Sequence, residues 1–213
     1  MSRLPVQPTK SNLLSLREEL DFARTGHQLL QEKREILLMR IRELIEDLHR
    51  RQGDLYRELA LCYRALTRAA LSVGWTKLDS VHVRPEGQPE VTFDHKHYMG
   101  IDLPQVHFAP PSSRPHYSPA GSNSLLDDAQ RRFVELLAPL VEYAELQAHL
   151  WSLSLALKKT MKRVNALENL FIPDYEDTVT YVTETLEEIE REETYVRKLI
   201  KESKRERRHS QNV

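Results

Sequence analysis

Proline and glycine are unevenly distributed, and this distribution constrains the fold more than any other feature of the sequence. Seven of the 11 prolines lie between residues 85 and 119, and four of the 6 glycines lie between residues 74 and 121. Proline breaks helices and glycine weakens them. The chain should therefore have two long helical arms and an interrupted middle. We expect helical arms at residues 9–73 and 122–208, a hairpin and Pro-rich loop region at 74–121, and a disordered tail at 209–213.

The first arm has the periodicity of a coiled-coil helix. Thr9, Ser11 and Asn12 offer capping side chains at its start, and Gly74 suits the left-handed residue beyond its end. Its apolar residues alternate in steps of three and four, which favours a repeat of about 3.5 residues. After Leu48 the step changes, as in a stutter that relaxes a supercoil. The apolar seam consists of Leu13, Leu16, Leu20, Ala23, His27, Leu30, Arg34, Leu37, Ile41, Leu44 and Leu48, and it resumes at Leu59, Cys62, Leu66, Ala69 and Val73.

The second arm carries a seam that shifts its position beyond Pro173, so this proline predicts a kink or a register shift in a long helix. Neither arm can bury its seam alone. We therefore expect a mainly α fold, in which the N- and C-terminal helices form a long antiparallel two-stranded coiled coil. In this pairing Leu20 should lie near Ile189 or Val196. The salt-bridge spacing of Glu187 with Arg191 and of Glu193 with Arg197 also supports a helix.

The middle of the chain alternates polar and apolar residues in the manner of strands. Val81–Arg84 and Glu90–Asp94 predict two strands, and Pro85–Gly87 predicts the turn between them. A third extended segment is expected at Pro104–Phe108. The middle region should therefore hold a small β-hairpin.

Composition excludes several functional classes. A single cysteine excludes a disulfide framework and fits a reducing compartment. With 31 basic and 32 acidic residues, the chain lacks the charge of a nucleic-acid-binding surface. The longest runs without a charged residue are 12 residues, whereas a membrane span needs about 20. No signal peptide and no glycine-rich phosphate loop is visible. We expect no nucleic acid, no direct membrane insertion and no cofactor.

Histidines in the middle region raise the possibility of a metal site. His95 and His97 would share one strand face and could hold zinc with His82 or His107. No cysteine or acidic ligand completes a standard spacing, so exposed hairpin histidines are the favoured interpretation, and no metal is expected. Cys62 occupies a seam position and is interpreted as a small core residue.

Charged and polar residues at unusual positions have two interpretations each. The basic run from Arg197 to Arg208 could bind nucleic acid or anionic lipid, but cations at a helix C-terminus also complement the helix dipole, and this is favoured. His27 and Arg34 interrupt the first seam, and Asn165 lies beside the second. Such residues usually fix helix register; contact with a third protein is the alternative.

Two pairs of segments carry more information than periodicity. The first pair is Pro8–Leu14 (Pro-Thr-Lys-Ser-Asn-Leu-Leu) with Gly26–Arg34, and the second is Lys159–Glu168 with Leu186–Glu193. Ile172-Pro173 lies within the second pair, and His97–Ile101 precedes Leu103-Pro104 in the middle. Together they resemble the D subunits of the V-type (archaeal and vacuolar) rotary ATPases and ATP synthases over nearly the whole chain. The run Arg-Val-Asn-Ala-Leu-Glu at 163–168 is the most specific part. The short basic tail and the Pro-rich stretch 110–119 depart from the family.

The resemblance implies a non-catalytic central rotor shaft that couples ATP synthesis or hydrolysis to H+ or Na+ transport. It implies that the paired termini enter a catalytic hexamer of A and B subunits, that a small F subunit binds the shaft's side, and that the other end engages an adaptor on the membrane ring. The shaft would lie peripherally on the cytoplasmic side. The motif residues implied in packing the shaft are Pro8, Asn12, Leu13, Leu14, Gly26, Leu30, Lys33, Arg34, Arg163, Val164, Asn165, Ala166, Leu167, Glu168 and Pro173.

Two rival functions stay open at this point. A coiled-coil scaffold or tether without motor function would form a stable homodimer and would not bind the hexamer. A zinc hydrolase would depend on the hairpin histidines.

Overall fold

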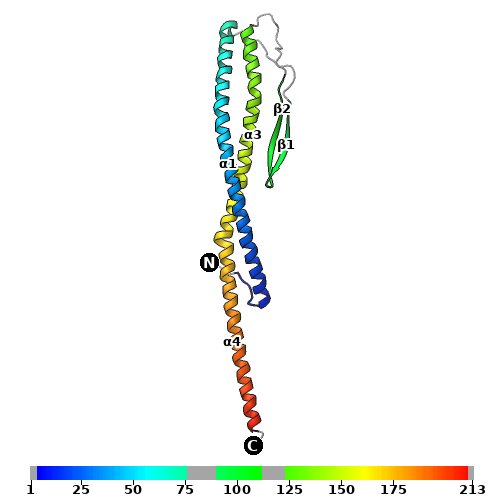
Figure 1. Ribbon diagram of the computed structural model, residues 1–213, viewed down its shortest axis with the longest axis vertical. Coiled ribbons are helices and arrows are strands. Elements are labelled where there is room, and N and C mark those ends of the chain that lie inside the picture. The colour runs from blue at the N-terminus through cyan, green and yellow to red at the C-terminus, as the bar shows by residue number, and fades with distance from the viewer. Residues whose placement is uncertain (1–3, 76–89, 112–122, 211–213) are drawn as a thin grey trace. The chain divides into compact units, whose positions relative to one another are not determined.

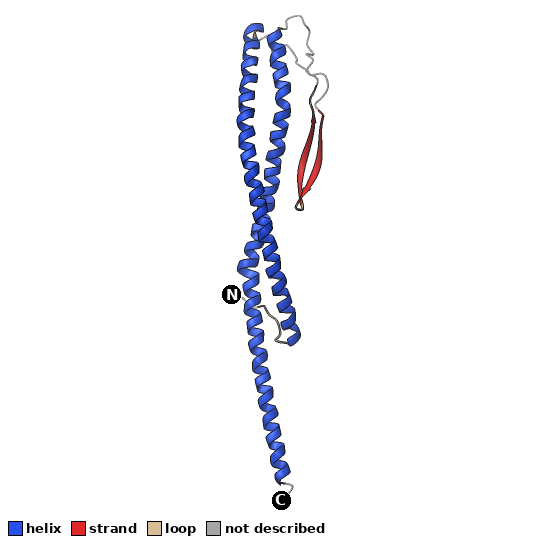
Figure 2. Ribbon diagram, viewed as in Figure 1, coloured by secondary structure: helices blue, strands red, loops and turns tan. Residues whose placement is uncertain are grey.

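The computed structural model describes residues 4–75, 90–111 and 123–210, with side chains up to residue 203. The predicted fold class is confirmed: two long helical arms enclose a small hairpin in the order of the chain (Figure 2). The elements are α1 (Lys10–Val73), β1 (Glu90–Tyr98), β2 (Ile101–Ala109), α3 (Ser124–Ala166), a π-helical segment (Leu167–Phe171) and α4 (Ile172–Ser210), as labelled in Figure 1.

The chain forms two compact units. The terminal unit comprises residues 1–35 and 159–213, and the middle unit comprises residues 36–158. Helix α1 contributes to both. The division into arms, middle region and tail, taken as domains, stays a prediction. Residues 211–213 of the predicted tail lie outside the described residues.

Both ends of α1 have the predicted caps. At the start, the Asn12 N–H donates to Thr9 Oγ1 over 3.2 Å, and the Asn12 side-chain amide donates to the Gln7 carbonyl over 2.9 Å. At the end, the Gly74 N–H donates to the Ala70 carbonyl over 2.9 Å, and Gly74 has a φ of 86°. A Cβ is disfavoured at that angle, which explains why glycine ends this helix.

In the middle unit α1 and α3 run antiparallel, side by side (Figure 1). Arg51 of α1 pairs with Glu142 of α3, and Asn123, just before α3, donates to Ser72 near the end of α1 over 2.5 Å. An apolar cluster near the same ends of these helices joins Ala65 and Ala69 of α1 to Leu126 and Ala129 of α3. Alanines at these positions let the two helices approach closely.

The described hairpin includes the predicted strand Glu90–Asp94 within β1 and has a turn that was not predicted. Strand β1 pairs with β2, so that His95 lies opposite Pro104. The turn is Met99-Gly100, with φ values of 50° and 75°. The predicted strand Val81–Arg84 and the predicted turn Pro85–Gly87 lie outside the described residues. The third predicted extended segment, Pro104–Phe108, is confirmed as part of β2.

The hairpin is held to α3 by its second strand. Leu103 is buried in a cluster with Leu37, Ile41, Leu44 and Leu153, which joins α1, α3 and β2. The Val106 N–H donates to Glu145 over 3.2 Å, and the His149 ring nitrogen Nε2 donates to the Pro104 carbonyl over 2.6 Å. Proline has no N–H, so the carbonyl is the one main-chain group of Pro104 that can form a hydrogen bond.

In the terminal unit α1 pairs with α4 in the predicted antiparallel direction, but the predicted register is wrong. Lys10 contacts Glu190 at 2.5 Å, and Arg24 contacts Glu176 at 2.6 Å. Glu190 therefore lies beside Lys10, ten residues before Leu20, and not beside Leu20 as expected. Seam packing tolerates several registers, and these cross-helix contacts select one.

The predicted register shift near Pro173 coincides with a π-helical segment. Residues 167–171 form this segment, and the Ile172 N–H donates to the Leu167 carbonyl, five residues earlier. A π turn carries one extra residue, and such turns rotate the following helix face. Pro173 follows at once and cannot donate to a carbonyl of the preceding turn. Pro139, by contrast, lies inside α3 without ending it.

Candidate functional site

The family-like segments of the two arms come together in the terminal unit. Gly26–Arg34 belongs to α1, and Lys159–Glu168 belongs to α3 and the π-helical segment. Glu168 lies 3.9 Å from the His27 ring nitrogen Nε2, which has no hydrogen-bond partner within residues 4–75, 90–111 and 123–210. Segments far apart in sequence thus form one surface of a helix pair.

The motif residues differ in burial. Val164 is fully buried and anchors the helix pair. Those that are half-buried are Pro8, Asn12, Leu13, Gly26, Leu30, Lys33, Arg34, Ala166, Leu167 and Pro173, and those that are exposed are Leu14, Arg163, Asn165 and Glu168. The motif therefore combines packing positions with outward-facing positions.

Thr178 is a packing residue that the sequence analysis missed. It is 1% exposed, and its hydroxyl donates to the Asp174 carbonyl over 2.6 Å while accepting the Leu4 N–H over 3.1 Å. The segment before α1 thereby folds back onto α4. Thr178 lies four residues before the buried Val182, on the same face of the helix. Counting threonine among the possible seam residues would therefore have predicted its burial.

Tyr175 of α4 is coupled to Glu19 of α1. Burial, followed by a hydrogen bond from the hydroxyl to the Glu19 carboxylate and by that group's charge, raises the pKa of Tyr175. Because the folded pKa is raised, the stability that this tyrosine contributes is complete below its unfolded pKa of about 10. It is lost as the pH rises towards the folded pKa.

Replacing Glu19 by glutamine should lower the pKa of Tyr175 but leave it above the ordinary value, because burial remains. The measurement is an ultraviolet titration, with a Tyr175→Phe variant identifying the signal. Glu18→Gln, an exposed neighbour on α1, serves as the control and should change nothing. Equal pKa values in wild type and Glu19→Gln would refute the coupling.

An apolar stripe extends along the C-terminal part of α4. We call Ile189, Val196, Leu199 and Ile200 the C-terminal stripe; each is between 40% and 51% exposed. Helix α1 begins at Lys10, beside Glu190, so it provides no partner for α4 beyond that point. Exposed apolar residues repeated on one helical face are typical of a binding surface.

The other candidate residues have ordinary surroundings. Among the described residues no cluster of three or more His, Cys, Asp or Glu side chains could hold a metal. His97 pairs with Asp102 across the hairpin. Cys62 is buried, as predicted, and burial raises the pKa of its thiol, which makes it a poor nucleophile.

The charged residues of α4 form pairs within the helix. Arg191 lies 3.6 Å from Glu187, and Arg197 lies 3.1 Å from Glu193, which confirms both predicted pairs. Part of the basic run is thus neutralised locally. In the part of the chain that the structure describes, no helix is both long and apolar enough to cross a membrane.

Comparison with known proteins identifies relatives along nearly the whole chain. The family model for the D subunit of ATP synthase matches residues 12–202. A V-type ATP synthase D subunit of Thermotoga neapolitana is 34% identical over 202 residues, covering 93% of this chain and 98% of the relative. The V-type ATP synthase D subunit numbered 2 of Treponema pallidum is 32% identical, covering 95% and 97%. An A-type ATP synthase D subunit of Pyrococcus horikoshii is 29% identical, covering 93% and 94%.

Proposed function

The chain belongs to the family of ATP synthase D subunits, and on that premise we propose that it is the central rotor shaft of a V-type ATP synthase. In this role it couples ATP synthesis or hydrolysis to ion transport across the membrane by rotation. The observation that carries the proposal is the match to this family over residues 12–202. The antiparallel pairing of α1 with α3 and with α4 supports it.

A pair of unlike helices suits an axle between equivalent catalytic sites. Chemically identical sites adopt different states only if something without their symmetry acts on each differently. Helices α1 and α4 present different side chains in each direction: Phe22 and Leu29 are exposed on one, Tyr181 and the C-terminal stripe on the other. Turning such a shaft would change which conformation each site favours.

The shaft acts as part of a complex and has no catalytic site of its own. Its partners would be the A and B subunits of the catalytic hexamer, the small F subunit and an adaptor on the membrane ring. It associates peripherally, on the cytoplasmic side. The C-terminal stripe supports a hexamer contact, because Val196, Leu199 and Ile200 lie beyond the start of α1 and are apolar side chains of the kind that a protein cavity would cover.

The motif residues would then have two roles. Val164, with Leu13 and Leu30, packs the shaft so that the helices turn together. The exposed Arg163, Asn165 and Glu168 would face the surrounding subunits. This assignment explains why residues with little burial belong to the most specific segment of the sequence.

The proposal is tested by assembling the chain with purified A and B subunits and measuring association and ATPase activity. Replacing Val196 and Ile200 by serine should weaken association roughly tenfold or more, because apolar interface area is lost. The free protein should keep its stability, since both side chains are exposed. Replacing the exposed Lys198 by serine is the matched control.

One outcome would overturn the proposed function and another would overturn only the proposed contact. If the wild-type chain does not associate with the hexamer and forms a stable homodimer instead, it is a scaffold or tether. If the double serine variant associates as tightly as the control, the C-terminal stripe is not the contact.

A further inference from the structure

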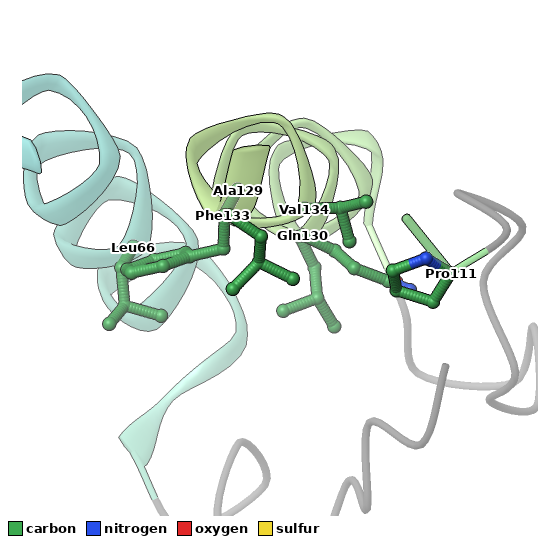
Figure 3. A pocket seen from close by; sticks show the side chains of 8 residues that line it. Leu66, Pro111, Ala129, Gln130, Phe133 and Val134 are labelled. Atoms are coloured by element: carbon green, nitrogen blue, oxygen red, sulfur yellow. The ribbon is translucent and has the colours of Figure 1, made fainter. Parts of the chain in front are cut away.

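An apolar groove lies in the middle unit, between α1, α3 and Pro111, which is two residues beyond the end of β2. Its volume is about 350 Å³, and its lining includes Leu66 of α1, Pro111, and Ala129, Phe133 and Val134 of α3 (Figure 3). A volume of this size accommodates a small ligand or one to two large side chains. Nothing in the function proposed so far uses this groove.

Gln130 is the exception to the apolar lining. Its side chain extends towards Pro111 at the groove (Figure 3). The residue is only 8% exposed, and neither its Nε2 nor its Oε1 has a hydrogen-bond partner among the residues that the structure describes. Buried polar groups are nearly always paired in folded proteins, so an amide with both atoms unpaired requires an explanation.

The chemistry of the groove specifies the kind of ligand. A primary amide both donates and accepts, so its complement must offer an acceptor and a donor together. A main-chain peptide group does so, and a hydrocarbon chain does not. The described residues that line the groove carry no charge, which disfavours an ionic ligand. Its apolar walls suit the aliphatic or aromatic side chain that such a peptide would carry.

We propose that this groove binds an extended apolar peptide segment of another protein of the complex, with the Gln130 amide paired to its main chain. The inference rests on the proposed function, because that function supplies the other proteins. Binding would pair both amide atoms and cover the groove at the same time.

The decisive variant is Gln130→Met, which keeps the size of the side chain and removes its hydrogen bonds. In the isolated chain the melting temperature should be unchanged or higher, because an unpaired buried amide has been removed. In the assembled membrane complex the variant shaft should be released about tenfold faster on washing, because a partner peptide group is left unpaired. Gln147→Met is the matched control, since Gln147 is an exposed glutamine on the same helix.

A crosslinking measurement identifies the occupant. Val134→p-benzoylphenylalanine, irradiated in the whole complex, should form a crosslink to a peptide of another protein of the complex. The same replacement of the exposed Arg131 should form none to that peptide.

Three results would overturn the proposal. A lower melting temperature for isolated Gln130→Met would show that the chain pairs this amide itself. Unchanged release from the complex would show that the amide binds nothing there. A crosslink only within the chain, to a second copy or to lipid would identify another occupant. Failure of the proposed function is distinguishable, because the wild-type chain would then be absent from the purified complex.

Discussion

Replacing Leu37 by alanine is expected to lower the free energy of unfolding of the middle unit by about 2–5 kcal/mol. Leu37 is fully buried in the cluster that joins α1, α3 and β2, together with Ile41, Leu44, Leu103 and Leu153. Alanine would remove apolar contacts with three elements and leave a cavity that the long helices could close only in part. Urea unfolding followed by circular dichroism measures the change.

Leu61→Ala is the control for this prediction. Leu61 is also a leucine of α1 in the middle unit, but it is 48% exposed. Its truncation should cost much less than that of Leu37, because surface substitutions away from packed contacts change stability by about 0.5 kcal/mol or less. Similar losses at the two positions would mean that the cluster around Leu37 does not carry the packing assigned to it.

Replacing Leu103 by alanine is expected to release the hairpin while α1 and α3 stay paired. A two-stranded hairpin is marginally stable alone in water, so β1 and β2 depend on their attachment to the helices. Leu103 supplies the buried apolar part of this attachment, beside the hydrogen bonds to Glu145 and His149. A loss of about 2 kcal/mol at this contact corresponds to a roughly thirtyfold rise in hairpin opening.

Hydrogen exchange measures this release amide by amide. Amides that β1 and β2 exchange with each other should become about thirtyfold less protected, whereas helical amides of α1 should keep their protection. Phe93→Ala is the control, because Phe93 lies on β1 and is 71% exposed. Equal loss of protection in the helices and the hairpin would show that Leu103 supports the whole unit and not a separable attachment.

The helices were predictable because their signals are local. Thr9 and Gly74 define the two ends of α1 through a side-chain cap and a left-handed residue, and the seam residues Leu16, Leu20 and Leu37 are buried as expected. Each of these features depends on neighbouring residues along one helix. Their prediction therefore required no knowledge of the partner helix.

Register was not predictable for a physical reason. Sliding one coiled-coil helix by a heptad of about seven residues presents an equivalent apolar face, so the seam alone could not exclude pairing of Leu20 with Ile189. The contacts Lys10–Glu190 and Arg24–Glu176 break this degeneracy. The extra residue of the π-helical segment shifts the seam further. The change in apolar spacing near Pro173 indicated this shift, but it did not fix which residues of the two helices pair.

Polar residues of the interior were missed because apolar patterning treats them as surface. Thr178 and Gln130 are both buried, yet neither contributes to an apolar seam. The turn at Met99-Gly100 was missed because its sequence is a weaker turn signal than Pro85–Gly87, whose prediction lies outside the described residues. The motor function came from the resemblance at 163–168 and not from periodicity.

The most direct test of the rotor assignment is observation of rotation in single complexes. The catalytic hexamer would be fixed to a surface, and a bead would be attached to the described hairpin through Phe93→Cys, with Cys62 replaced by alanine. On addition of ATP the shaft should turn continuously in one direction, and turning should stop when ATP is removed. A shaft that stays stationary while the same complexes hydrolyse ATP would contradict the account.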